Sequence, residues 1–316
     1  MATTEGVKPQ LAPAHAIQAQ AAARKRAIGL LLAALGAIAF SGKAIIVKLA
    51  YRYGVDAVTL IMYRMLFALP FFVVMAWWAG RGKPPLARRD WAGVLGLGFI
   101  GYYLSSMLDF AGLQYITASL ERLILYLGPT LVLLLGWALR GRRITRGHLA
   151  ATAVSYVGAL LVFGLELRVA PTGATAWGAL LVFISTFTYA LYLFYSGEFV
   201  QRLGSLRLVG LATAFACVCC IVQFLAVKPL SAAQVAPEVI WLSILNATLC
   251  TAAPVLMVMM AVERLGPSLA AQMGMIGPLS TIAMGIVILD EPFTPWLAAG
   301  TVLVVAGIFM FSRAGR

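Results

Sequence analysis

The sequence of 316 residues has few charged residues. Asp, Glu, Lys and Arg make up 11% of the chain, whereas 62% of the residues are hydrophobic. A typical soluble domain has roughly 25% charged residues, and a soluble chain of this composition would expose large apolar patches to water. The composition therefore excludes an ordinary cytosolic enzyme, a disordered protein and a nucleic-acid-binding protein.

Residues that bind metals or catalyse reactions are also scarce. The only histidines are His15 and His148, and the sequence has no Ser-His-Asp arrangement and no GxxxxGK[ST] motif for ATP. All four cysteines lie in apolar stretches, where thiols mostly serve packing: Cys217, Cys219, Cys220 and Cys250. We therefore predict no catalytic residues, no metal and no cofactor, and a protein that is not an enzyme.

Long apolar runs are abundant. A helix needs about 20 apolar residues to cross about 30 Å of hydrocarbon, and a chain in lipid must satisfy its backbone hydrogen bonds internally. Ten runs fit this length: 27–48, 56–79, 90–110, 115–139, 147–165, 174–195, 207–227, 238–260, 267–289 and 295–312. We predict an all-α membrane protein with ten transmembrane helices, preceded by a tail over residues 1–26.

Lysine and arginine are distributed unevenly between alternate loops. If the N-terminus lies inside, the cytoplasmic segments hold 17 basic residues, whereas the outer loops hold 3, namely Arg52, Arg168 and Lys228. Membrane proteins retain basic residues on the cytoplasmic side. We therefore predict a multi-pass protein of the inner (plasma) membrane with both termini in the cytoplasm.

The chain carries an internal repeat with an offset of 149 residues. This offset places Gly128-Pro129 on Gly277-Pro278, and Gly158 on Gly307. Because each half holds five spans, the two halves would enter the membrane from opposite sides, which is a common transporter architecture. We predict two inverted five-helix repeats, over residues 27–165 and 174–312.

Several segments resemble EamA domains of the drug/metabolite transporter superfamily. The resemblance rests on ITASLERLILYLGPTLVLLLG and ILDEPFTPWLAAGTVLVVAGIFMF, and on Arg64 in the second span. It covers about residues 25–312 and implies export of small metabolites by alternating access. Within the superfamily the chain is similar to YddG-type exporters of aromatic or neutral amino acids. The loop after the fourth span departs from the pattern, because Arg142 stands where the second half has Glu291.

Five of the charged residues within the predicted spans or at their rim are candidates for a function: Lys43, Arg64, Asp109, Glu121 and Arg122. A charge in hydrocarbon is costly unless it is paired or hydrated, and all five lie in the outer half of the predicted bundle. Two interpretations stay open. The charges form a salt-bridge set that closes the outer end, or Lys43 and Arg64 meet an anionic group of the substrate, with Asp109 or Glu121 available for an ammonium group.

Neutral polar and aromatic side chains complete the candidate substrate-binding residues: Tyr102, Tyr103, Tyr189, Tyr192, Asn246 and Gln272. A tyrosine deep in a span needs a partner for its hydroxyl group, and a cavity lined by such residues suits amino acids. The same aromatic stripe also fits packing against helices or lipid.

Prolines at equivalent positions of the two halves are candidate hinges. Pro129 and Pro278 each remove a backbone hydrogen bond, which kinks or weakens a helix. Their alternative role is to shape the helix for its neighbours.

We therefore predict a transporter that exports small metabolites, with aromatic or neutral amino acids as the expected substrates. Its partners are a small-molecule substrate and the lipid bilayer, not nucleic acid, and a monomer is compatible with the sequence. A drug or cationic-metabolite exporter is the alternative, although the positive charges of Lys43 and Arg64 disfavour it. An intramembrane enzyme is a second alternative, which would have to use Asp109 and Glu121 as paired acids.

Overall fold

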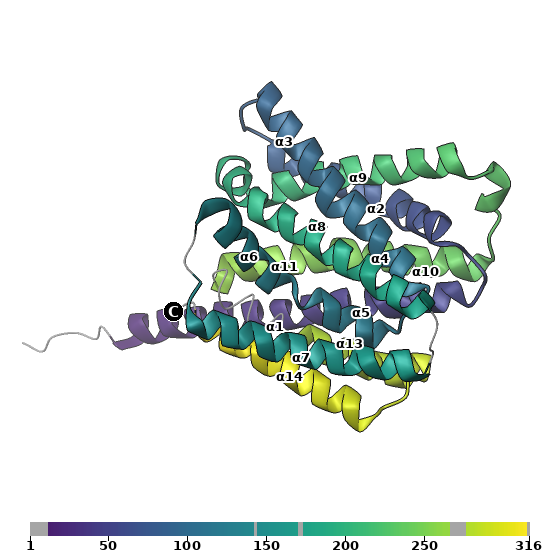
Figure 1. Cartoon of the computed structure of the whole chain (residues 1–316). Coiled ribbons are helices and arrows are strands. Elements are labelled where there is room, and N and C mark those ends of the chain that lie inside the picture. Colours follow the sequence, from purple (N-terminus) through teal and green to yellow (C-terminus); the bar gives the residue numbers. More distant parts are fainter. Residues whose placement is uncertain (1–11, 142–143, 170–172, 266–275, 315–316) are drawn as a thin grey trace, which may run out of the picture.

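The computed structural model describes residues 12–141, 144–169, 173–265 and 276–314, and these residues form helices and no strand (Figure 1). The first half contains α1 (Ala12–Tyr51), α2 (Ala57–Gly80), α3 (Arg88–Gly98), η1 (Phe99–Leu104), α4 (Ser105–Leu113), α5 (Ala118–Leu125), α6 (Gly128–Arg140) and α7 (Arg146–Val169). The second half contains α8 (Gly173–Leu203), α9 (Ser205–Val227), η2 (Leu230–Ala233), α10 (Pro237–Ala247), η3 (Thr248–Ala252), α11 (Ala253–Leu265), α13 (Ile276–Leu289) and α14 (Pro295–Ala314).

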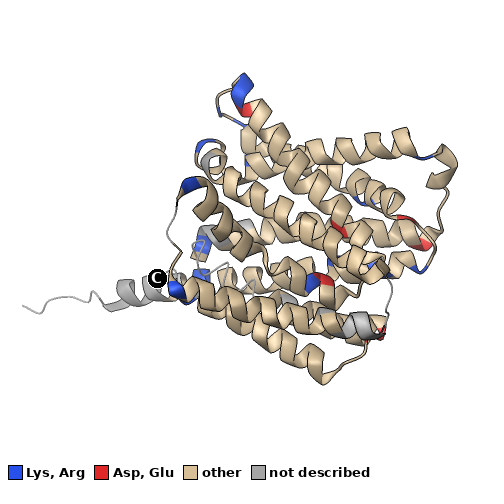
Figure 2. Cartoon of the chain, viewed as in Figure 1, with Lys and Arg blue, Asp and Glu red and all other residues tan. Residues whose placement is uncertain are grey.

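Seven helical segments of the described chain are long and apolar enough to cross a membrane: Ala23–Tyr51, Ala57–Gly80, Arg88–Leu113, Ala118–Arg140, Gly173–Gly197, Ser205–Val227 and Pro237–Val258. Shorter apolar helices cover Leu279–Leu289 and Pro295–Gly307. Charged residues lie mostly near the helix ends, with long uncharged stretches between them (Figure 2). The predicted all-α membrane class is thereby supported.

Helix boundaries repeat with the offset found in the sequence. Adding 149 residues to the starts of α3, η1 and α7 gives residues 237, 248 and 295, where α10, η3 and α14 begin. Both η1 and η3 are π-helical turns inside otherwise α-helical segments. Because π-helical turns are rare, their placement at equivalent positions is strong structural evidence for the repeat.

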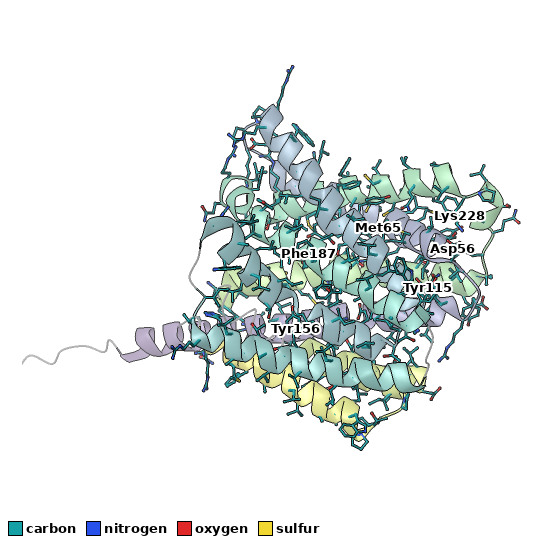
Figure 3. All side chains as sticks on the ribbon, in the orientation of Figure 1. Asp56, Met65, Tyr115, Tyr156, Phe187 and Lys228 are labelled. Carbon is teal, nitrogen blue, oxygen red and sulfur yellow. The ribbon has the colours of Figure 1, made fainter. Side chains whose placement is uncertain are left out.

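Equivalent helices of the two halves pack against each other in opposite directions. α2 packs on α9, and Asp56 before α2 lies beside Lys228 after α9 (Figure 3), with Oδ1 and Nζ 3.2 Å apart. The start of α2 therefore meets the end of α9. Antiparallel equivalent helices are the arrangement expected of inverted repeats.

α7 and α14 also run antiparallel, side by side at one edge of the bundle (Figure 1). A Cβ atom on Gly158 would lie 2.6 Å from the carbonyl oxygen of Gly300, and one on Gly307 would lie 2.7 Å from that of Ala151. Glycine at these positions therefore allows the two helices to approach closely.

The fourth predicted span is two helices rather than one. α5 ends at Leu125, α6 begins at Gly128, and Pro129 lies in the first turn of α6. Proline is tolerated there because the first backbone N–H groups of a helix have no intrahelical acceptor. Pro278 is the third described residue of α13. Pro129 therefore lies in the first turn of a helix, directly after a break, whereas the residues before Ile276 lie outside the described part of the chain.

Candidate substrate site

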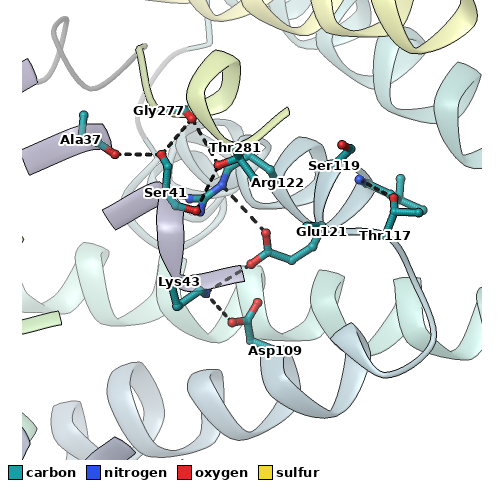
Figure 4. A network of polar contacts seen from close by, with 12 residues as sticks. Ala37, Ser41, Lys43, Asp109, Thr117, Ser119, Glu121, Arg122, Gly277 and Thr281 are labelled. Carbon is teal, nitrogen blue, oxygen red and sulfur yellow. Dashed lines mark hydrogen bonds and ion pairs between the residues drawn. The ribbon is translucent and has the colours of Figure 1, made fainter. Parts of the chain in front are cut away.

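Lys43 on α1 connects two buried carboxylates from different helices (Figure 4). Its Nζ bonds to Oδ2 of Asp109 on α4 and lies 3.2 Å from Oε1 of Glu121 on α5. Lys43 is 6% exposed, Asp109 3% and Glu121 0%. Their burial means that these charges depend on one another instead of on water.

Arg122 extends this network to the second half of the chain (Figure 4). Its Nε lies 3.9 Å from Oε2 of Glu121, and its Nη2 donates to the carbonyl oxygen of Ser41 at 3.4 Å. The Ser41 hydroxyl donates to the carbonyl oxygen of Gly277, and Thr281 donates to the same oxygen at 3.2 Å. We call Lys43, Asp109, Glu121 and Arg122 the ion network; it ties α1, α4 and α5 to α13.

Arg64 on α2 stands apart from the ion network. Its Nε donates to Oγ1 of Thr251 at 3.1 Å, and Thr251 donates to the backbone carbonyl of Asn246 at 2.8 Å. The guanidinium carbon lies 5.1 Å from the centroid of the Phe110 ring. The five charges predicted from the sequence therefore separate into a network of four and one arginine that bonds to Thr251 of η3, which in turn bonds to Asn246 of α10.

Several buried polar atoms have no hydrogen-bond partner among the described residues. They include Nη1 of Arg64, Oδ1 of Asp109, both carboxylate oxygens of Glu121 and Oδ1 of Asn246. The oxygens of Glu121 still have ion pairs with Lys43 and Arg122. Unpaired buried polar groups are costly, so these residues are the candidates for contacts with a ligand.

The predicted tyrosines form a second group. The hydroxyl oxygens of Tyr102 and Tyr192 lie 3.2 Å apart, with ring centroids 5.0 Å apart. Tyr189 stacks on Tyr192 at 5.5 Å, whereas Tyr103 packs on Phe99. We call Tyr102, Tyr189 and Tyr192 the tyrosine cluster; it joins η1 to α8.

The 149-residue offset relates the tyrosine cluster to the charged residues. Tyr192 is equivalent to Lys43, Tyr102 to Thr251, and Thr213 to Arg64. The two halves thus place different chemistry at the same positions of one backbone architecture. Gln272, a further predicted substrate residue, lies outside the described residues, as does Arg142.

Sequence reasoning missed the contributions of Thr251 and Ser41. Both are small hydroxyl residues in apolar helices, a pattern that fits helix packing equally well. The sequence does hold one indication for Thr251: the 149-residue offset makes it equivalent to Tyr102, which is a candidate substrate residue. The described residues contain no group of three or more His, Cys, Asp or Glu that could hold a metal ion.

Comparison with known proteins assigns this architecture. The EamA-like transporter family matches residues 27–164 and again residues 176–313. The chain belongs to the EamA-like transporter family. The resemblance to EamA domains is thereby confirmed, and the family makes this protein a membrane transporter.

Two further comparisons give a relative and a similar fold. The chain is 28% identical over 293 residues to the "Uncharacterized transporter YcbK" of Bacillus subtilis (strain 168), which covers 86% of this EamA-like chain and 88% of the relative. A crystal structure aligns with a TM-score of 0.61 over 92% of this chain and 99% of that chain. At 20% identity, this second likeness concerns the fold.

Proposed function

We propose that this EamA-like transporter exports small metabolites, with aromatic or neutral amino acids as substrates, by alternating access across the inner membrane. It does so with ten transmembrane helices in two inverted five-helix halves, 27–165 and 174–312, and with both termini in the cytoplasm. The candidate substrate residues are Lys43, Asp109 and Glu121 of the ion network and the three residues of the tyrosine cluster, together with Arg64, Tyr103, Asn246 and Gln272. Pro129 and Pro278 act as hinges.

The observation that carries this proposal is the equivalence of the Lys43 and Tyr192 positions in two antiparallel halves. In an inverted repeat, equivalent positions lie at opposite depths about the membrane midplane. The ion network then closes the outer half of the path, and the tyrosine cluster closes the cytoplasmic half. Two chemically distinct closures can open in turn, as alternating access requires.

The chemistry of the two closures favours amino acids over organic cations. In the membrane core, the buried cations Lys43, Arg64 and Arg122 outnumber the buried anions Asp109 and Glu121. The remaining buried carboxylate among the described residues, Asp90 in the first turn of α3, pairs with Arg202. A positive site repels drugs and quaternary ammonium ions. Aromatic rings at the other closure suit aromatic or aliphatic side chains. Export as the direction, and the YddG-type subfamily, rest on the resemblance of the sequence to that family.

Counterflow in proteoliposomes tests the proposed function. Liposomes that contain the purified protein are loaded with one unlabelled compound, and a trace of the same compound in labelled form is added outside. Liposomes without protein serve as the control. The set comprises aromatic and neutral amino acids, purines and quaternary ammonium drugs. We expect amino acids to accumulate. Accumulation of the drugs without amino acids would overturn the substrate class, and accumulation of none would overturn the carrier role for all three classes.

A further inference from the structure

Among the described residues, Arg64 is a buried charged residue of the membrane core without an ion-pair partner. Lys43, Asp109, Glu121 and Arg122 all pair with one another. Arg64 is only 5% exposed, so its guanidinium has little contact with bulk solvent. An unpaired guanidinium at membrane depth is costly, and an anionic group of a ligand would supply the missing counter-charge.

The surroundings of Arg64 hold its guanidinium in one orientation. Thr251 accepts from Nε and uses its own proton on the Asn246 carbonyl, and the Phe110 ring lies against the guanidinium. This leaves Nη1 as the donor without a partner among the described residues. Because α2 supplies the arginine and η3 supplies Thr251, the donor sits where the two halves of the chain meet.

Charge balance identifies the group that fits this donor. Within the membrane core, the ion network has two cations and two anions and is neutral, so the positive charge without a counter-charge is that of Arg64. A carboxylate group supplies the counter-charge at this donor and matches the geometry of a guanidinium. It does so both in an anion and in a zwitterion whose ammonium group lies against another acceptor. A phosphate dianion would bring more negative charge than Arg64 balances, and an organic cation would add positive charge.

We propose that Arg64 binds the carboxylate of the transported substrate, which makes the substrate class organic monocarboxylates and includes the amino acids. This assignment deepens the proposed function and rests on it. Asn246, whose Oδ1 is buried without a partner among the described residues, supplies a neutral acceptor on the same chain of hydrogen bonds for an ammonium group. The ion network keeps its internal pairs and does not contact the carboxylate.

Four compounds with the same ring separate the contributions of carboxylate and ammonium. Thermal stability of the full-length protein in detergent is measured with L-phenylalanine, 3-phenylpropionate, L-phenylalaninamide and phenethylamine. We expect the two acids to raise the melting temperature and the amide and amine to leave it unchanged. Equal stabilisation by phenylalanine and its amide, or stabilisation by none of the acids, would overturn the assignment of Arg64.

Variants assign the effect to this residue. Arg64→Gln should bind the acids about tenfold or more weakly, since a charge-assisted hydrogen bond is lost, and should no longer distinguish acid from amide. Arg64→Lys keeps the charge and should retain the preference for acids at reduced affinity, which keeps the test decisive where the Gln variant does not fold. Arg202→Gln removes an arginine that pairs with Asp90 outside this site and should retain full discrimination. Acid preference retained in Arg64→Gln contradicts the proposal.

The two proposals fail in different ways. Acids that bind through Arg64 but show no counterflow would leave the binding site intact and overturn the carrier role for these substrates. Counterflow of amino acids that is equally fast in Arg64→Gln, at matched protein content, would leave the carrier intact and overturn the role of Arg64.

Discussion

At the scale of single residues, the ion network is a set of charges that stabilise one another only together. Each member is nearly inaccessible to water, so taking these groups out of water carries a penalty that only their mutual attraction offsets. Removing one partner strands the others. The sensitivity of this network to substitution therefore depends on the number of stranded charges, not on the number of lost contacts.

Lys43→Ala should impair transport more than Lys48→Ala. Lys43 loss strands Asp109 and Glu121 and should lower stability by about 3 to 5 kcal/mol. Lys48 instead donates to the backbone carbonyls of Leu113 and Ile116, at 3.1 and 2.9 Å. Both of these bonds are to neutral backbone groups. Flux in liposomes at matched protein content, with melting temperature in detergent, compares the two variants, which remove the same charge from the same helix.

A double variant checks the physical cause. Lys43→Ala alone leaves Asp109 and Glu121 without their lysine, whereas Lys43→Ala combined with Asp109→Asn leaves only the Glu121 carboxylate without it. The double variant should therefore melt at a higher temperature than Lys43→Ala alone. Equal flux of the Lys43→Ala and Lys48→Ala variants would show that Lys43 serves only as an interface anchor.

At the scale of elements, the second half of the chain caps a helix of the first half. Glu291, between α13 and α14, accepts from the backbone N–H of Ala118 at 2.7 Å and from the Ser119 hydroxyl at 2.5 Å. These donors belong to the first turn of α5, where a carboxylate also meets the positive end of the helix dipole. α5 carries Glu121 and Arg122, so the cap positions half of the ion network.

Glu291→Gln should therefore lower stability by about 1 to 2 kcal/mol. The amide keeps one acceptor oxygen but loses the charge and one of the two acceptors. Glu238→Gln is the matched control, because Glu238 lies exposed in the first turn of α10. Melting temperatures in detergent decide the comparison: an equal shift for both variants would show that the contacts of Glu291 contribute nothing specific.

Pro129→Ala and Pro278→Ala should each slow transport while leaving the protein folded. Alanine restores a backbone N–H and would let α6 extend backward across the break after Leu125. A continuous helix would resist the bending that opening and closing need. Liposome flux reports the rate, and monodisperse elution with an unchanged melting temperature reports folding. Wild-type flux in both variants would leave the prolines with a role in helix shape alone.

At the scale of the whole molecule, both termini should lie in the cytoplasm. The 17 to 3 distribution of basic residues predicts this orientation. Alkaline phosphatase and green fluorescent protein fusions after Arg316 and after residue 10 report the side of each end. Phosphatase activity at either end would contradict the orientation and, with it, the assignment of the ion network to the outer half.

The sequence alone determined the class of the molecule. Apolar length, basic-residue asymmetry and one offset of 149 residues predicted a helical membrane protein built from repeats, and the segments around Glu121 and Glu291 predicted its family. These features can be read without knowing the three-dimensional structure. The hydropathy of a span depends only on neighbouring residues in the chain, and the repeat depends only on residues 149 positions apart.

Only the tertiary structure decided how the candidate residues are grouped. The sequence placed five charges at similar depth, but the rotation of each helix about its axis separates Arg64 from Lys43, Asp109, Glu121 and Arg122. The π-turn η3 carries Thr251, the bonding partner of Arg64. A hydropathy pattern does not predict which side chains will bond to each other, because the partner can come from the other half of the chain, as Thr251 does for Arg64.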